Sequence, residues 1–114
     1  MEVHQAICSG QLVLTPSDSL MIGGRAEQFE DVLQNAILAG TLYVIVDLRD
    51  VSHADSGGIR ALVRGHLAVS QKGGRVSLVN VSANLARVLH ILRLDSVFAI
   101  YDSVDAAVAD VAGT

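Results

Sequence analysis

One stretch of the sequence constrains the fold more than any other: residues 42–48 form a near-continuous apolar run rich in β-branched side chains. A strand with one face in water alternates apolar and polar residues, whereas a strand covered on both faces does not. The run therefore predicts a central strand of a parallel sheet. It should direct Val44 and Val46 to one face and Tyr43 and Ile45 to the other, with both faces covered.

The flanking segments supply the helices and strands that such a sheet needs. Apolar residues at helical spacing predict helices over residues 25–39 and 56–71, and a strand over 76–79 completes a βαβ unit. Gly40 and Gly73-Gly74 are typical helix ends. The inner face of the 56–71 helix is expected to comprise Ile59, Leu62, Val63, Leu67 and Ser70, with His66 beside them.

Weaker signals complete the pattern. Short strands are expected over residues 2–7, 11–15, 20–22 and 97–100. Ser82 should cap a third helix, and Asp102 or Ser103 should cap a fourth. The apolar face of the third helix is expected to comprise Leu85, Val88, Leu89 and Leu92. The sum is one α/β domain over residues 1–114, with a small mixed, mostly parallel sheet of four or five strands and about four helices.

Composition excludes several classes of function. A chain of 114 residues has room for one domain, and a net charge of −4 with Lys72 as its one lysine argues against nucleic acid binding. Cys8 stands alone, so no internal disulfide can form, and we expect it to fill a small apolar space. The four histidines show no paired ligand spacing, so we expect neither a metal nor another cofactor. No apolar run approaches a membrane span, and we expect a cytoplasmic protein.

The junction between the buried strand and the next helix is the one segment that suggests chemistry. Ser56 is predicted to be the N-cap, and Gly57 and Gly58 leave the first helical turn open. Unpaired N–H groups and the helix dipole there would accept the charge of a phosphoserine, although Asp55 beside it would repel that charge. The plainer alternative is that Asp-Ser-Gly-Gly is only a turn and a helix cap.

Two enzyme interpretations of this junction are weak. A nucleophile elbow needs Gly-x-Ser-x-Gly, and Ala54 stands where the first glycine should be. His53 is only three residues from Ser56, whereas the members of a catalytic triad meet through the fold. A P-loop needs Gly-Lys-Ser/Thr, which residues 57–65 do not contain. We therefore expect no enzymatic activity.

Three blocks of sequence, residues 44–51, 54–59 and 73–80, resemble the STAS domain of bacterial anti-sigma factor antagonists, and residues 88–107 agree with the end of that domain. The resemblance implies a STAS-like fold and a protein-binding switch. In such proteins the unmodified domain binds an anti-sigma factor, usually a GHKL-type serine kinase, and so frees the sigma factor. The kinase phosphorylates a serine in this loop, and a PP2C-type phosphatase restores the active form.

Carried over by position, the resemblance makes Ser56 the phosphorylation site, supported by Asp55, Gly57 and Gly58. The partner-binding residues expected around this site are His53, Ser56, Arg60 and Arg64. Many family members have a second serine where this chain has Gly57, and the loop at residues 18–23 also departs from the common pattern.

Other functions remain open at the level of sequence. One is a non-enzymatic STAS adaptor in a stressosome-like or lipid-transport ABC assembly, with Ser56 only a cap. Another is a small-ligand sensor. The oligomeric state is also open, a weak homodimer included.

Overall fold

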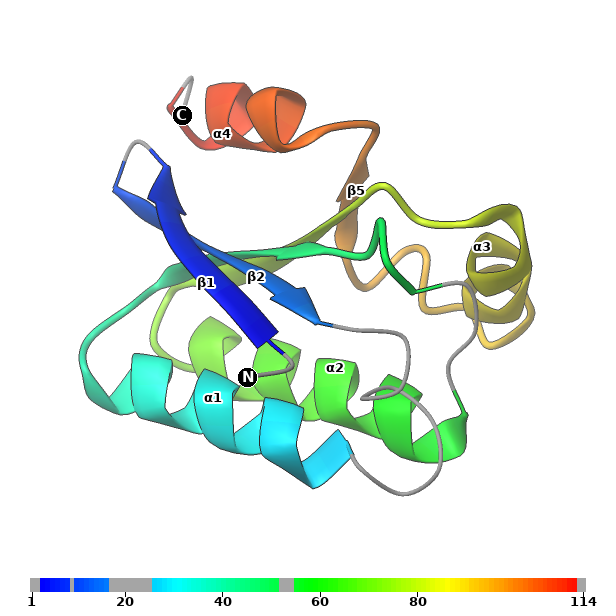
Figure 1. Ribbon diagram of the computed structural model, residues 1–114, viewed down its shortest axis with the longest axis horizontal. Helices are drawn as coiled ribbons and strands as arrows, with labels where there is room; N and C mark the ends of the chain where they lie inside the picture. Colours follow the sequence, from blue (N-terminus) through cyan, green and yellow to red (C-terminus); the bar gives the residue numbers. More distant parts are fainter. Residues whose placement is uncertain (1–2, 9, 17–25, 52–54, 113–114) are drawn as a thin grey trace.

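The computed structural model describes residues 3–8, 10–16, 26–51 and 55–112, which form a five-stranded sheet in the order β1-β2-β3-β4-β5 with helices on both faces (Figure 1). The β1–β2 pair is antiparallel, and every other neighbouring pair is parallel. The expected mixed, mostly parallel α/β fold is thereby confirmed. In chain order the elements are β1 (Val3–Cys8), β2 (Gln11–Pro16), α1 (Ala26–Leu38), β3 (Tyr43–Asp47), α2 (Ser56–Ser70), β4 (Arg75–Val79), α3 (Ala83–Ile91), β5 (Ala99–Tyr101) and α4 (Val104–Ala112).

The apolar run does form the central strand, β3, and its two faces enter two different cores. Val44 and Val46 lie in the larger core, towards α1 and α2, which lie side by side below the sheet in Figure 1. Ile45 is fully buried on the other face in a smaller core that includes Ala107 of α4. Tyr43 does not join that core and is exposed, so the expectation that both faces are covered holds for the middle of β3 and not for its first residue.

Helix ends follow the local chemistry of the sequence. Gly40 has a φ of 95°, a left-handed conformation that costs glycine little, and it ends α1. The Ser82 hydroxyl accepts a hydrogen bond from the Leu85 N–H (3.1 Å) at the start of α3. At α4 the Ser103 hydroxyl accepts from the Ala106 N–H (3.1 Å), which decides between the two expected caps in favour of Ser103.

The expected inner face of α2 is wrong in part, because Leu67 and Ser70 are exposed. The buried stripe of α2 also includes Val69 and the small residues Ala61 and Gly65, which face α1. A Cβ atom at Gly65 would lie only 2.7 Å from Leu33 Cδ1. Packing against α1 as well as the sheet therefore selects the small side of the helix.

The expected apolar face of α3 is likewise only half correct. Leu85 and Leu89 are buried, whereas Val88 and Leu92 are exposed. The short strand expected over residues 20–22 lies outside the described residues. In the part of the chain that the structure describes, no helix is long and apolar enough to cross a membrane.

Candidate functional site at the start of α2

Asp55, not Ser56, is the N-cap of α2. Its backbone is extended (φ −85°, ψ −176°), and its Oδ1 atom accepts a hydrogen bond from the Gly58 N–H (3.1 Å). The Ile59 N–H closes the first turn by donating to the Asp55 carbonyl oxygen (3.0 Å). The expectation that Ser56 is the cap is therefore wrong by one residue, because aspartate caps a helix as well as serine does and here it reaches the third N–H.

This one-residue difference changes what Ser56 can do. As the first residue of α2, Ser56 is exposed, and its hydroxyl makes no hydrogen bond among the described residues. Gly57 belongs to the same arrangement, since a Cβ atom there would lie 3.3 Å from Asp55 Oδ1 and crowd the cap. Asp55 therefore takes the structural role at the start of α2, and Ser56 is left exposed.

Ser56 stands at the edge of a largely apolar depression between α2 and α3. From α2, Ile59, Arg60 and Val63 line it together with Ser56. Val88 of α3 and Leu92, the C-cap of α3, complete the lining. Sequence reasoning had placed these two α3 residues in the core, and their exposure here gives the depression an apolar surface. We refer to these residues together with Asp55 as the Ser56 depression.

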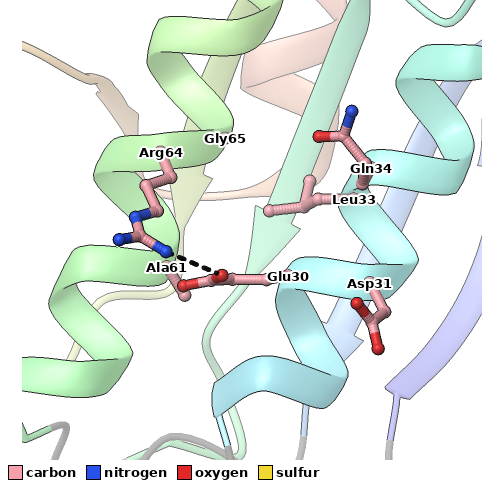
Figure 2. Close-up of a pocket in the computed structure, with 7 residues that line it drawn as sticks. All are labelled: Glu30, Asp31, Leu33, Gln34, Ala61, Arg64 and Gly65. Atoms are coloured by element: carbon pink, nitrogen blue, oxygen red, sulfur yellow. Dashed lines mark hydrogen bonds and ion pairs between the residues drawn. The ribbon is translucent and has the colours of Figure 1, made fainter.

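The other residues expected to contact a partner do not all gather there. Arg64 lies in a second hollow, between α1 and α2, where its Nη1 atom is 3.3 Å from Glu30 Oε2, and Figure 2 shows the two side chains turned toward each other. His53 lies outside the described residues. The structure therefore brings together Ser56 and Arg60, and it directs Arg64 toward α1.

A polar network missed by the sequence analysis anchors the strand that leads to this loop. The buried Asp47 carboxylate, at the end of β3, accepts hydrogen bonds from Arg49 N (3.1 Å), Arg49 Nε (2.7 Å) and Asn80 Nδ2 (3.0 Å). Burial raises the pKa of Asp47, but these donors and the Arg49 charge outweigh burial and hold the pKa below its ordinary value. The signal in the sequence is an aspartate that ends an otherwise apolar strand.

The remaining His and Cys side chains that the structure describes lie apart from this site. In the described ranges, no three His, Cys, Asp or Glu side chains lie close enough together to hold a metal ion. His66 is half-buried, with its ring edge-on to Phe98 at a centroid distance of 5.5 Å, as a boundary residue would be. Cys8 is a half-buried free thiol beside the smaller core, which agrees with the expected apolar filler.

Comparison with known proteins places this geometry in a family context. Residues 1–107 match the family model described as the STAS domain. A relative from Thermotoga neapolitana, named as a candidate anti-sigma factor antagonist and TM1081 homologue, is 29% identical over 102 residues, 90% of each chain.

Two solved structures share the fold. The TM1081 crystal structure from Thermotoga maritima, named as a candidate anti-sigma factor antagonist, has a TM-score of 0.84 and 24% identity, covering 95% of this chain and 92% of that one. The phosphorylated form of the Bacillus cell fate determinant SpoIIAA has a TM-score of 0.70 and 18% identity, covering 95% and 96%. At these sequence identities, the two structures show only that the fold is shared.

Proposed function

Because the chain belongs to the STAS domain family, we propose that it is an anti-sigma factor antagonist that binds a serine-kinase anti-sigma factor at the Ser56 depression. Phosphorylation of Ser56 switches this binding off. The observation that carries the proposal is the position of Ser56: its hydroxyl is exposed, free of the capping role that Asp55 takes, and beside an apolar surface.

The depression has the composition of a small docking site. Its apolar lining residues would lose water on contact, which is the main favourable term in association. Arg60 lines the depression, is exposed and makes no ion pair among the described residues. A cation there favours an acidic partner surface and steers its approach. Arg64, being paired with Glu30, contributes less to such a contact.

Phosphate transfer requires that Ser56 lie inside the interface. A GHKL-type kinase must bring the γ-phosphorus of its ATP within about 3–3.5 Å of the Ser56 oxygen. The new bond joins Ser56 Oγ to phosphorus, while the bond from phosphorus to the bridging oxygen of ADP breaks. The hydroxyl proton passes to a base on the kinase. This chain supplies the acceptor oxygen and no catalytic group of its own.

Phosphorylated Ser56 weakens the contact between this chain and the kinase through charge repulsion. A phosphate on Ser56 adds about −1.5 to −2 charges beside the Asp55 carboxylate and within the contact. Like charges at a partly desolvated contact cost several kcal/mol, and each ~1.4 kcal/mol is tenfold in affinity. The fold need not change, because the start of a helix tolerates negative charge. A PP2C-type phosphatase in the same cytoplasm would remove the phosphate and restore binding.

The test is an affinity series against the serine-kinase anti-sigma factor of the host, measured by calorimetry. Ser56→Ala should bind as wild type does and should not be phosphorylated. Ser56→Glu and the phosphorylated protein should bind a hundredfold or more weakly, since about 2.8 kcal/mol corresponds to that factor. Ser96→Glu adds the same charge to an exposed serine outside the depression and should bind normally. Equal affinities across the Ser56 series would instead favour the non-enzymatic adaptor.

A further inference from the structure

Arg60 lies about one helical turn after Ser56 and carries a charge that nothing in the described chain neutralises. Both residues line the Ser56 depression, Ser56 as the first residue of α2 and Arg60 four positions later. Arg60 is exposed and has no ion pair with any described residue. Among the described residues that line the depression, it is the only cation. Its guanidinium group is therefore available to an anion that arrives at this surface.

The geometry of an α-helix brings this cation towards Ser56. Residues four apart on a helix are neighbours, with about 5–6 Å between their Cβ atoms. The Cα–Cβ bonds of a helix tilt towards its N-terminus, so the long side chain of Arg60 extends back towards the first turn. In a pair with this spacing, the favourable order places the anion first and the cation second. A phosphate on Ser56 and the guanidinium group of Arg60 have this order.

The cap of α2 makes Arg60 the strongest donor for such a phosphate. Asp55 Oδ1 already accepts from the Gly58 N–H (3.1 Å), and the Ile59 N–H donates to the Asp55 carbonyl oxygen (3.0 Å). Two donors at the start of the helix are therefore engaged. The Asp55 carboxylate, next to Ser56, opposes a second negative charge. A guanidinium group can give a phosphate two charge-assisted hydrogen bonds, which are stronger than bonds from neutral donors.

Arg64, one turn further along α2, is not placed for this role. Its Nη1 atom is 3.3 Å from Glu30 Oε2 on α1, and Figure 2 shows the two side chains turned toward each other. Its position is about 12 Å from that of Ser56 along the helix axis, at about 1.5 Å per residue. That exceeds the distance of about 8 Å at which physiological salt screens exposed charges. The two arginines carry the same charge on the same helix, and only Arg60 is near Ser56.

We propose that Arg60 is the internal counter-ion of phosphorylated Ser56. The inference rests on the proposed function for the event that attaches the phosphate. Before phosphorylation, the charge of Arg60 faces an approaching acidic surface. Afterwards, it pairs with the phosphate of its own chain. Phosphorylation then weakens the kinase contact in two ways, because it adds negative charge and also withdraws the cation that the acidic surface would meet.

The experiment uses the full chain with phosphoserine incorporated at position 56 during translation, so that no kinase is needed. A phosphorus NMR titration measures the second pKa of the phosphate, which is ordinarily about 6. Arg60 should favour the dianion and lower this pKa. Arg60→Gln should therefore raise the pKa by about 0.3 unit or more, the size expected for one exposed ion pair at this spacing. Arg60→Lys keeps the charge and should recover most of the difference.

Arg64→Gln is the matched control, because it removes the same charge from the same helix. It should leave the phosphate pKa unchanged. Equal pKa values in the wild-type chain and Arg60→Gln, or an equal rise in both glutamine variants, would overturn the proposed pairing. An Arg60→Lys value equal to that of Arg60→Gln would also contradict it. All variants should remain folded by circular dichroism, since they replace exposed side chains. A kinase that leaves Ser56 unmodified would contradict the proposed function without changing this titration, so the two proposals fail separately.

Discussion

At the scale of single residues, Asp47 links the sheet to the loop that carries Ser56. It ends β3, it is buried, and it receives donors from Arg49 on its own strand's extension and from Asn80 after β4. Asn80 is held in the left-handed region, with a φ of 55°, so that its side-chain amide reaches the carboxylate. The ionised carboxylate therefore fixes where the chain leaves two neighbouring strands.

The lowered pKa of Asp47 predicts a pH-dependent contribution to stability. Because the folded pKa lies below the unfolded value of about 3.9, the contribution is present above that value and is lost as pH falls through the folded pKa. Asp47→Asn should lower the free energy of unfolding by roughly 1–3 kcal/mol at pH 7, since the donors from Arg49 and Asn80 lose their ionised acceptor. The deficit should shrink below about pH 4.

Urea unfolding of both proteins at pH 7 and near pH 3 measures this difference. A deficit of the same size at both pH values would show that shape, and not charge, accounts for the effect of the substitution.

Sequence reasoning found the right pair of residues at the start of α2 and assigned one role to the wrong member. Both aspartate and serine are good N-caps, so composition could not say which of Asp55 and Ser56 would close the turn. The φ of −85° and the contact from Asp55 Oδ1 to the Gly58 N–H decide it. Similarly, the i, i+4 spacing of Arg60 and Arg64 places them on one side of a helix, but Glu30 on α1 is what draws Arg64 away.

At the scale of elements, two adjacent positions between α2 and β4 require glycine for different reasons. Gly73 has a φ of 81° and open space around its Cβ position, so conformation is what requires glycine there. Gly74 has an ordinary φ, but a Cβ atom on it would lie 2.0 Å from the Leu42 carbonyl oxygen. That oxygen accepts the hydrogen bond of the Arg75 N–H (2.8 Å), which joins the connection to the start of β4.

Gly74→Ala should therefore destabilise the chain more than Gly73→Ala. At Gly73 the cost is that of a left-handed alanine, about 1–2 kcal/mol. At Gly74 the backbone of Leu42 must move and weaken the bond to Arg75, so we expect about 3 kcal/mol or more. Asparagine, which tolerates the left-handed region, should be accepted at position 73 and rejected at 74. Urea unfolding of the four variants gives the comparison, and similar losses at both positions would refute it.

Element boundaries were largely predictable, whereas helix faces were not. Periodicity predicted a helix over residues 56–71, and α2 spans Ser56–Ser70. Hydrophobicity alone favoured Leu67 as an inner residue, yet the side of α2 that packs is the one with Ala61 and Gly65. The hydrophobic pattern of α2 alone carries no information about α1. The close packing of α1 against α2 favours small residues at the contact.

At the scale of the whole molecule, the sheet separates two cores of unequal size. The larger lies under α1 and α2 and extends to Phe98, and the smaller lies under α4. The apolar run at residues 42–48 was sufficient to predict that β3 is covered on both faces, because a one-sided strand would alternate. It could not reveal that the second covering is a single nine-residue helix, which leaves Tyr43 exposed.

Because, in the described part of the chain, α4 alone covers the second face of the sheet, a substitution at Ile45 tests whether α4 unfolds together with the rest of the domain. Ile45 is fully buried against Val13, Val79 and Ala107, so Ile45→Ala leaves a cavity and should cost about 2–5 kcal/mol. Typical domains have about 5–15 kcal/mol of stability, so the variant should remain folded. Ile91→Ala, at an exposed isoleucine, should change stability by less than about 0.5 kcal/mol.

Two probes decide the question of cooperativity. Urea unfolding should be followed by far-UV circular dichroism, which reports all helices, and by tyrosine fluorescence, since the chain has Tyr43 and Tyr101 and no tryptophan. Tyr101 packs against the smaller core, so its signal reports the α4 layer. Coincident midpoints that shift together in Ile45→Ala mean one unit. A shift under about 0.5 kcal/mol would place β3 at the periphery of the fold, and a tyrosine transition that moves alone would make α4 a separately melting layer.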